Sequence, residues 1–407
     1  MTRATSLLSA AVLALLLGGI AAWLLLRRPP TFPSGLRLLP LHYHDLPGWK
    51  QIDPRAALAA LRRSCRVLAQ KPPSAPMAGA GYAGTMAPWQ RACAGLPQEP
   101  QSPRGARQWF EHHFLPAEIA AGAHRRGLLT GYYEPEITGR RRREGSFRIP
   151  VYGRPSDLIS VDLGRFRPRW QGRYLFGRLD GEALVPYPSR EVIASKGLAT
   201  APVLFWTSDP EALFFLQVQG SGRVRFGNGS VFRVDYAGQN GRPYTAIGRI
   251  LVHMGALSPS GVSLERIRAW LHHHPQLAPT IMDRDASYVF FRLAPLSHPG
   301  LGPVGTEGVP LTPRASLAVD PRFHPLGIPF YVVAPPPHLG VAPLRQLMIA
   351  QDTGGAIKGA LRGDVFWGFG ASAEELAGAM KAQGKFFVLL PASLWRQLAR
   401  QRSEAND

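Results

Sequence analysis

The chain has 407 residues, a formal net charge of +20 and 45% hydrophobic residues. This apolar content excludes an intrinsically disordered chain, and the presence of only one long apolar run excludes a membrane protein with several spans. The length indicates two domains or one domain with a large insertion, and the 43 glycines and 39 prolines favour short strands joined by turns.

The N-terminal region contains an uncharged apolar run from Ser6 to Leu26, closed by Arg27 and Arg28. As a helix, a run of this length spans about 30 Å of hydrocarbon, and it is longer than the apolar segment of an ordinary signal peptide. We therefore expect residues 1–30 to form an uncleaved signal anchor that meets the membrane through residues 6–26. A cleaved signal peptide remains the alternative. No cysteine stands directly after the run, so a lipoprotein signal is excluded.

The region that follows is expected to be helical. Asp53-Pro54 is typical of a helix start. Apolar residues then recur on one helical face, at Leu58, Leu61, Cys65 and Leu68. A loop is expected over residues 71–81, and a second helix over Ala106–Phe114 that Pro116 ends or bends.

From residue 128 onward, short apolar runs alternate with turn residues, which is typical of β-strands. Strands are expected over Leu128–Tyr133, around Tyr152, and over Leu204–Trp206, Leu213–Val218, Val231–Tyr236, Tyr288–Leu293, Phe330–Val333, Leu347–Ala350, Val365–Phe369 and Phe386–Leu390. Two helices interrupt them, one near Ser263–His274 and one that begins with the capping-box pattern of Ser372 and Glu375. The sequence therefore predicts a mainly β fold.

Charge and cysteine content leave alternatives open. Cys65 and Cys93 are the only cysteines, and they form either one disulfide in an oxidising compartment or two buried thiols. The basic excess attracts polyanions, but it does not choose among nucleic acid, acidic lipid and acidic glycan. The run Arg140–Arg143 is most simply a solvated loop, and His272–His274 are most simply solvated residues at a helix end.

Three aspartates in the C-terminal third lie beside glycine or proline in turn and strand contexts: Asp320, Asp352 and Asp364. A carboxylate beside a glycine at a strand end can point into a groove and approach a ligand closely. Each also has a purely structural interpretation, as a turn former, an Asx turn or a surface charge, and the residues alone do not decide. The triplet Asp352-Thr353-Gly354 occurs once, whereas an aspartic protease needs two facing copies.

Aromatic residues next to turns give a second signal. They include Tyr132, Tyr133, Tyr236, Tyr244, Phe366 and Trp367. Aromatic faces stack on sugar rings, although aromatic and basic surfaces also suit single-stranded nucleic acid. The glycines at 220–227 lack the spacing of a dinucleotide loop, and tandem histidines chelate one metal poorly, so we expect no cofactor and no metal site.

Several motifs occur in a fixed order within residues 128–391. They are Thr130-Gly131-Tyr132-Tyr133, Gln217-Val218-Gln219-Gly220-Ser221-Gly222, Tyr236-Ala237-Gly238-Gln239-Asn240-Gly241, Ser287-Tyr288-Val289-Phe290-Phe291, the stretch 327–332, and Asp352-Thr353-Gly354-Gly355-Ala356-Ile357-Lys358-Gly359 followed by Arg362 and Asp364. This collinear set resembles the membrane-bound lytic murein transglycosylase A family, and its C-terminal part resembles the three-aspartate (3D) domain of that family.

The resemblance implies a fold of two β-rich domains. A double-psi β-barrel would take residues 38–136 and 292–395, with the 3D region at 311–391, and a smaller inserted β-domain would take residues 137–291. A glycan strand of peptidoglycan would lie between them. The expected fold class is mainly β, with a few peripheral helices and the N-terminal signal or transmembrane helix.

The resemblance also implies an enzyme that cleaves the MurNAc–GlcNAc β-1,4 bond and leaves 1,6-anhydro-MurNAc ends. Asp364 would be the single catalytic acid and base, and Asp352 and Asp320 would support the site. Substrate contacts are expected from Thr130, Tyr132, Tyr133, Gln217, Gln219, Ser221, Lys358 and Arg362, with strand pairing and packing as alternative roles for the threonine, tyrosines and glutamines. Because Asp364 must start protonated, its pKa has to be raised, so we expect Lys358 and Arg362 to point away from it.

The family's usual lipid-attachment cysteine is absent from this chain. We therefore expect a periplasmic body in the cell envelope, tethered to a membrane by residues 6–26 and without a nucleic-acid partner. Two alternatives remain open. One is a non-catalytic peptidoglycan-binding or scaffolding protein, because one fold can serve several functions. The other is nucleic-acid binding, which requires a cytoplasmic body.

Overall fold

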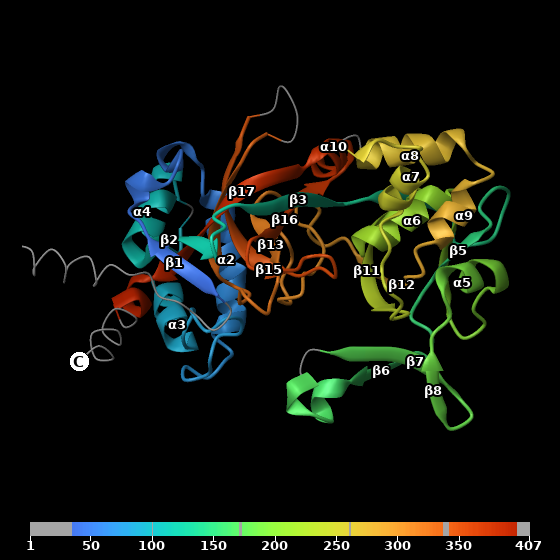
Figure 1. Ribbon diagram of the computed structural model, residues 1–407, viewed down its shortest axis with the longest axis horizontal. Helices are drawn as coiled ribbons and strands as arrows, with labels where there is room; N and C mark the ends of the chain where they lie inside the picture. The colour runs from blue at the N-terminus through green and yellow to red at the C-terminus, as the bar shows by residue number, and fades with distance from the viewer. Residues whose placement is uncertain (1–34, 100, 171–172, 260–261, 337–341, 397–407) are drawn as a thin grey trace, which may run out of the picture.

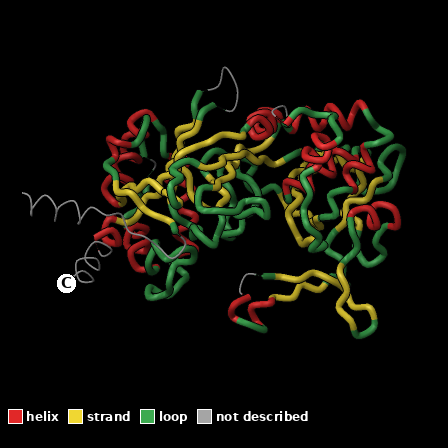
Figure 2. Tube along the Cα trace, viewed as in Figure 1, coloured by secondary structure: helices red, strands yellow, loops and turns green. Residues whose placement is uncertain are grey.

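The computed structural model describes residues 35–99, 101–170, 173–259, 262–336 and 342–396. Figure 1 shows two lobes side by side, with a thin arm next to them. The first lobe combines the N-terminal and C-terminal parts of the chain, and the second lobe is formed by the middle part. In Figure 2 the strands lie at the centre of both lobes, and helices pack around them.

Eight strands form the sheet of the first lobe. They are β1 (Leu36–Pro40), β2 (Phe114–Ala121), β3 (Gly127–Glu134), β13 (Ser316–Val319), β14 (Pro329–Ala334), β15 (Leu344–Asp352), β16 (Arg362–Phe369) and β17 (Lys381–Pro391). Their order is β1-β2-β17-β14-β15-β13-β16-β3, and β17 also pairs with β3. This last pairing closes a ring of six strands, so the first and last strands of the ring leave no open edge between them.

The ring surrounds apolar side chains from all six of its strands. The buried core of the first lobe includes Leu129, Leu317, Phe330, Val365 and Phe386, which come from five of these strands. Burial of each large apolar side chain contributes roughly 1.5–3 kcal/mol to the stability of the fold. The core therefore fixes the positions of the strands that carry the aspartates.

Helices and two short 3-10 turns pack around this sheet. They are η1 (Tyr43–Asp45), η2 (Trp49–Gln51), α2 (Arg55–Leu68), α3 (Met86–Ala94), α4 (Pro103–His113) and α10 (Ala371–Ala379). The predicted apolar face of α2 is confirmed, because Leu58, Leu61, Cys65 and Leu68 are all buried. A disulfide between Cys65 and Cys93 joins α2 to α3, which decides between the two alternatives for the cysteines.

The second lobe has a four-stranded sheet and a two-stranded sheet. Their strands are β4 (Glu136–Gly139), β10 (Gly222–Phe226), β11 (Val231–Gln239) and β12 (Val289–Pro295), and then β5 (Ile149–Tyr152) and β9 (Val203–Thr207). Helices cover them: α5 (Arg190–Lys196), α6 (Pro210–Gln219), α7 (Ile247–His253), α8 (Leu264–His273) and α9 (Ala278–Asp283). Three separate apolar clusters form the core of this lobe.

The arm consists of residues 159–186 and forms a three-stranded antiparallel sheet. Its strands are β6 (Ile159–Asp162), β7 (Tyr174–Asp180) and β8 (Ala183–Pro186), and two 3-10 turns, η3 (Leu163–Arg165) and η4 (Pro168–Trp170), precede β7. The chain enters and leaves the arm next to Leu158 and Tyr187, which are buried in the second lobe. Figure 1 shows the arm projecting from the second lobe, and Phe176 packs its base against that lobe.

A buried carboxylate at the end of β3 joins the two lobes. Glu134 accepts hydrogen bonds from Arg223 Nε over 2.8 Å and from Arg233 Nη1 over 2.7 Å, and all three side chains are buried. The two arginines also donate to the carbonyls of Pro299 and Leu301. Because a buried ion pair is costly to break, this cluster holds β3 against β10 and β11.

The expectation of a strand over Leu213–Val218 is wrong, because these residues lie in α6. Asp209 caps the helix by accepting from the Ala212 N–H over 2.8 Å, Pro210 occupies the first turn, and Gly220 ends it with a φ of 80°. Its central residues, Leu213–Gln217, are all buried in the lobe and all but Gln217 are apolar, so no polar face marks this part of the helix. A short apolar run alone does not distinguish a buried helix from a strand.

Two further expectations about helix ends are also wrong. Helix α10 begins after Gly370 without a side-chain cap, so Ser372 and Glu375 form no capping box. Helix α4 ends at His113, and Pro116 lies inside β2 rather than at a helix end.

The expected membrane span at residues 6–26 lies outside the described residues. Among the residues that the structure does describe, no helix combines the length and the apolar character needed to cross a bilayer.

Candidate active site

Asp352 and Asp364 lie in one row across neighbouring strands of the ring. Asp352 ends β15 and Asp364 lies in β16, and both are paired with Ala318 of the strand between them, β13. On its other side, Asp364 is paired with Thr130 of β3. Neighbouring strands are about 4.8 Å apart, so the two aspartates are about 10 Å apart along the row. The ring therefore brings two carboxyl groups and a hydroxyl to the same level.

The carboxyl group of Asp364 is held by Thr130. Thr130 Oγ1 donates to Asp364 Oδ1 over 2.6 Å, and Arg362 Nη2 donates to Thr130 Oγ1 over 2.8 Å. Burial raises the pKa of Asp364 to about 6, and the negative charge of Asp352 adds to this rise. The hydrogen bond from Thr130 and the positive charge of Arg362 lower the pKa, but by less. The residue is still partly exposed. A carboxyl group with such a pKa can both give and accept a proton near neutral pH.

The expectation that Arg362 points away from Asp364 is not met. Besides Thr130, the guanidinium of Arg362 donates to the backbone carbonyls of Gly363 and Leu128. Its charge acts on Asp364 and lowers the pKa of that carboxyl, but less than burial raises it. Arg362 is thus tied to β3 and β16 through the same hydroxyl that binds the aspartate.

Asp352 is fixed from two sides. Thr306 donates to Asp352 Oδ1 with its N–H over 3.0 Å and with its hydroxyl over 2.9 Å, and the Tyr132 hydroxyl donates to Oδ2 over 3.0 Å. Burial raises the pKa of Asp352, and the hydrogen bonds from Thr306, Thr353 and Tyr132 limit that rise. Both oxygens of Asp352 therefore accept hydrogen bonds, whereas Asp364 accepts one from the Thr130 hydroxyl, at Oδ1.

Asp320 has a different environment, in the turn after β13. Its carboxylate accepts a forked pair of hydrogen bonds from Arg322 and a further one from the Gly359 N–H over 2.7 Å. Burial alone would raise the pKa of Asp320, but these bonds outweigh it and lower the pKa to about 2. Asp320 is a permanently charged clamp between the β13 turn and the loop before β16.

A further carboxyl group lies behind Asp352. Glu307 accepts a hydrogen bond from Ser64 over 2.7 Å, and Gln351 in turn donates to Ser64 and accepts from Ser316. Burial raises the pKa of Glu307 to about 7, although Ser64 and Gln351 oppose this. Sequence reasoning missed both Thr306 and Glu307, because they lie in a Gly- and Pro-containing segment without periodicity.

Two glycines allow the strands to approach each other at this site. A Cβ atom at Gly363 would lie 2.9 Å from Phe386 and 3.1 Å from Leu129, and a Cβ atom at Gly131 would lie 2.5 Å from the Trp367 indole nitrogen. A side chain at either position would push β3 and β16 apart. Glycine is therefore required directly beside Asp364 and Thr130.

The other predicted substrate residues are spread over both lobes. Tyr132 lies against Phe366, with ring centroids 5.2 Å apart, and joins the aspartates. Tyr133 is buried, and its N–H donates to Gln219 at the end of α6. Ser221 is half-buried just before β10. Lys358 is exposed on the loop after β15.

Gln217 is not brought to the carboxyl groups. It is buried in the second lobe, where it accepts from Arg190 and donates to the Val289 carbonyl. Its partners explain this position, because Arg190 also contacts Asp285 and the Ser287 carbonyl. Gln217 thus holds α6 against β12.

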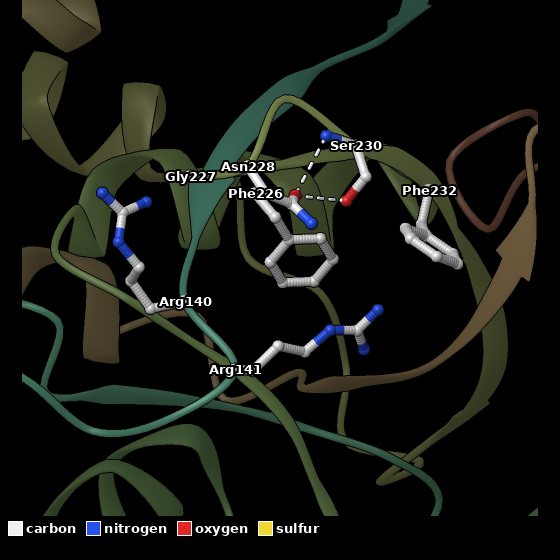
Figure 3. Close-up of a pocket in the computed structure, with 7 residues that line it drawn as sticks. All are labelled: Arg140, Arg141, Phe226, Gly227, Asn228, Ser230 and Phe232. Carbon is white, nitrogen blue, oxygen red and sulfur yellow. Dashed lines mark hydrogen bonds between the residues drawn. The ribbon is translucent and has the colours of Figure 1, made fainter.

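The basic run Arg140–Arg143 is largely exposed, as expected of a solvated loop, but it also contacts aromatic rings. The Arg141 guanidinium lies 4.1 Å from the ring centroid of Phe226 and 4.9 Å from that of Phe232, and Arg143 lies over Trp206. Figure 3 shows that Arg140 and Arg141 line a cavity together with Phe226 and Asn228. The cavity has a volume of about 410 Å³ and lies in the second lobe; none of the three aspartates lines it.

Two family models match this chain. Residues 128–292 match the MltA specific insert domain, and residues 315–390 match the 3D domain. The first match covers all but the first residue of the ring strand β3, and most of the second lobe with its arm. The second match covers the strands that carry Asp320, Asp352 and Asp364.

Known proteins are similar over most of the chain. A curated relative, membrane-bound lytic murein transglycosylase A of Escherichia coli (strain K12), is 33% identical over 274 residues, which are 65% of this chain and 66% of the relative. The crystal structure of a membrane-bound lytic murein transglycosylase from Agrobacterium tumefaciens is 34% identical with a TM-score of 0.77, over 90% of this chain and 99% of that one. The structure of E. coli MltA with bound chitohexaose is 25% identical with a TM-score of 0.62, over 89% and 96%.

Proposed function

Because this chain belongs to the membrane-bound lytic murein transglycosylase A family, we propose that it is a lytic transglycosylase of peptidoglycan. The bond that it cleaves is the β-1,4 bond between MurNAc and GlcNAc, and the product carries a 1,6-anhydro-MurNAc end. A relative that binds chitohexaose, a linear β-1,4 glycan, supports a glycan strand as the substrate. The cell-envelope location follows from the same relatives, which are named membrane-bound.

One observation carries the chemical part of this proposal. Asp364 is partly exposed, has a pKa raised to about 6, and lies level with a second carboxyl group on the same face of the ring. Glycoside cleavage commonly uses two carboxyl groups, one as the acid and one as the nucleophile or base. A lytic transglycosylase needs only one, because the nucleophile is a hydroxyl group of the substrate itself.

The reaction proceeds in two proton transfers at Asp364. Protonated Asp364 donates to the bridging oxygen as the bond between C1 of MurNAc and that oxygen breaks, and positive charge develops at C1. The C6 hydroxyl of the same sugar then attacks C1, and the Asp364 carboxylate accepts its proton. No water is consumed. Intramolecular attack supplies a high effective molarity, and general acid help adds about 10²–10⁴-fold in rate.

Asp352 acts through charge rather than by proton transfer. Both of its oxygens are bound by Thr306 and Tyr132, so it is held in place beside the reacting centre. Burial raises the pKa of Asp352 as well, so it is the ionised form of this group whose negative charge stabilises the positive charge at C1 and raises the pKa of Asp364. Asp320 supports the site from the turn after β13.

Substrate contacts are assigned to the residues that border this row. Tyr132 follows Thr130 on β3, Gln219 and Ser221 lie at the entry to β10, and Lys358 is free to reach a carboxylate of the glycan or its peptide. Tyr133 is buried in the core of the first lobe, so its role is packing. Thr130 and Arg362 act on Asp364 as well as on the substrate. Gln217 supports the second lobe instead, because it is buried and bound to Arg190.

The domain organisation that we propose follows the two lobes. A double-psi β-barrel takes residues 38–136 and 292–395, the inserted domain takes residues 137–291, and the glycan lies between them. The closed ring of six strands and the return of the chain to the first lobe support this division. The tether is the apolar run at residues 6–26, and the body is periplasmic; a disulfide in the first lobe supports an oxidising compartment.

The test is digestion of purified sacculi followed by mass analysis of the products. We expect muropeptides with anhydro-MurNAc ends from the native protein and from Asp180→Asn, an exposed aspartate on the arm. We expect a loss of at least about 100-fold in the rate for Asp364→Asn. Reducing ends instead of anhydro ends would identify a hydrolase. Binding of sacculi without any product would favour the alternative of a non-catalytic peptidoglycan-binding protein.

A further inference from the structure

The arm exposes an apolar surface that no part of the described chain covers. Phe166 is 70% exposed, Leu179 60%, Leu175 51% and Leu184 41%. The largest exposed apolar patches on soluble proteins are often functional and mark sites for partners or membranes. Here the exposed residues are concentrated in a segment of 28 residues that projects from the second lobe in Figure 1.

The strand register places the exposed leucines on one face of the arm. Val161 lies opposite Leu175, and Leu179 lies opposite Leu184, so these four aliphatic side chains line the same face. Phe176 points to the other face, where it meets the second lobe at Gly241; a Cβ atom at Gly241 would lie 2.6 Å from Phe176. The aliphatic face is therefore the one turned away from the second lobe.

A cluster of cations lies at one end of this face. The segment 163–173 between β6 and β7 contains Arg165, Arg167, Arg169 and Arg173 and no acidic residue. These arginines are exposed. The guanidinium groups of Arg167 and Arg169 lie 5.0 and 5.5 Å from the ring centroid of Trp170, and Phe166 lies between Arg165 and Arg167 in the chain.

We propose that the arm is a docking site for an anionic lipid bilayer. An aliphatic surface with arginines and aromatic residues at its edge matches the two parts of such a bilayer, the acyl region and the negative headgroups. Sugars offer no comparable partner, because they stack on aromatic faces rather than on leucines. A second copy of the chain is also disfavoured, because two bodies with a net charge of +20 repel each other.

Docking of the arm would set the orientation of the second lobe above the membrane. The chain enters and leaves the arm at Leu158 and Tyr187, which are buried in that lobe, so the arm and the lobe are connected through a packed base. This inference is independent of the proposed reaction, since Asp320, Asp352 and Asp364 all lie outside the arm.

The experiment places a fluorescent probe on the arm of the full-length protein, reconstituted in vesicles. Cys65 and Cys93 are joined in a disulfide, so a cysteine introduced by Leu179→Cys is labelled alone. The matched control is Met254→Cys, which is 53% exposed in the second lobe. Quenching by bromine-labelled lipid is compared in phosphatidylcholine vesicles and in vesicles that also contain phosphatidylglycerol, and thermal unfolding checks the fold of each variant.

We expect the probe at position 179 to be quenched at least twofold more in the anionic vesicles than in the neutral ones, and the probe at 254 to be unaffected by either. The double variant Arg165→Gln, Arg167→Gln should weaken this quenching, because each basic residue near an anionic surface contributes roughly fivefold in affinity. The proposal would be overturned if the probe at position 179 were not quenched, or if the probe at 254 were quenched equally. It would also be overturned if neither anionic lipid nor the two arginine substitutions changed the quenching. Shielding of the probe by sacculi instead of lipid would assign the arm to the cell wall.

Discussion

Asp320 and the Asp352–Asp364 row lie on the same few strands, yet their carboxyl groups are tuned in opposite directions. Asp320 is fully buried and has a pKa of about 2, whereas Asp364 is partly exposed and has a pKa of about 6. Burial acts on both. The difference lies in the partners, because Asp320 receives a forked arginine and a backbone N–H, and Asp364 receives one hydroxyl.

The comparison shows that a charged guanidinium and a backbone N–H outweigh burial at Asp320, whereas the neutral donors at Asp352 and Asp364 do not. A carboxylate held as Asp320 is stays charged at neutral pH and serves as a structural clamp. A carboxyl group with few donors and a negative neighbour keeps its proton near neutral pH and can act as an acid. Both kinds occur within one ring, so spacing in the sequence alone does not assign the roles.

The largest expected effect on stability is that of Asp320→Asn. The folded-state pKa of Asp320 is lowered to about 2, so its ionised form stabilises the fold above about pH 4, and this stabilisation is lost as the pH falls from 4 toward 2. We expect the variant to lose about 2–3 kcal/mol of unfolding free energy at pH 7. Urea unfolding at pH 7 and at pH 3 measures this loss, which should shrink at the lower pH. An equal loss at both would show that the charge is not the cause.

Asp364→Asn should change the unfolding free energy in the opposite direction, by stabilising the protein. Because the folded-state pKa is raised to about 6, the native protein is stabilised by the proton below pH 4, and that contribution is lost as the pH rises through 6. We expect the variant to be more stable than the native protein by roughly 2 kcal/mol at pH 8 and equally stable at pH 4. Destabilisation at pH 8 would mean that Asp364 is a clamp like Asp320.

Glu307→Gln tests whether a carboxyl group with a raised pKa near the site affects stability without taking part in catalysis. Burial raises the pKa of Glu307 to about 7, but the side chain faces Ser64 rather than the row of aspartates. We expect a gain in stability of about 1–2 kcal/mol at pH 8 that disappears below pH 5, with the rate of muropeptide release within about twofold of native. A large loss of activity would place Glu307 among the groups that control Asp352 through Thr306.

The smallest effects are shifts in the pH dependence of the reaction. Activity requires protonated Asp364, so the rate should fall as the pH rises through about 6. Asp352→Asn removes a negative neighbour and should move this fall to lower pH, whereas Thr130→Val removes a hydrogen bond to the carboxylate and should move it to higher pH. Profiles of kcat/KM for both variants check the two directions. Shifts with the same sign would contradict this description of the site.

The sequence predicted the parts of the fold that have strong local signals. The apolar face of α2 and the strands around Phe330–Val333 and Phe386–Leu390 are present, because periodicity and β-branched or aromatic residues identify them. Helix α6 was missed although Asp209-Pro210 repeats the signal that predicted the first helix correctly. The central residues of α6, Leu213–Gln217, are all buried, so no polar face marks them, and this hid the helical period.

The active-site residues were found through the resemblance to a family, and their arrangement was not predictable from spacing. The key element is β13, a strand of four residues that has no distinct pattern and pairs with both β15 and β16. Thr306 and Glu307 also give no signal in the sequence, because a loop brings Thr306 to Asp352 across 46 residues and Glu307 to Ser64 across 243. The arm was missed for the same reason, since its strands are short and its exposed leucines do not alternate with a buried face.

The central claim is that Asp364 keeps its proton to near neutral pH. The most direct test is to record the carboxyl carbon signals of protein labelled with ¹³C at aspartate while the pH is raised from 3 to 8. We expect one signal that titrates with a midpoint near pH 6 and is absent from Asp364→Asn. If the signal that disappears in this variant titrates near pH 4 or below, Asp364 is ionised at neutral pH and cannot be the acid.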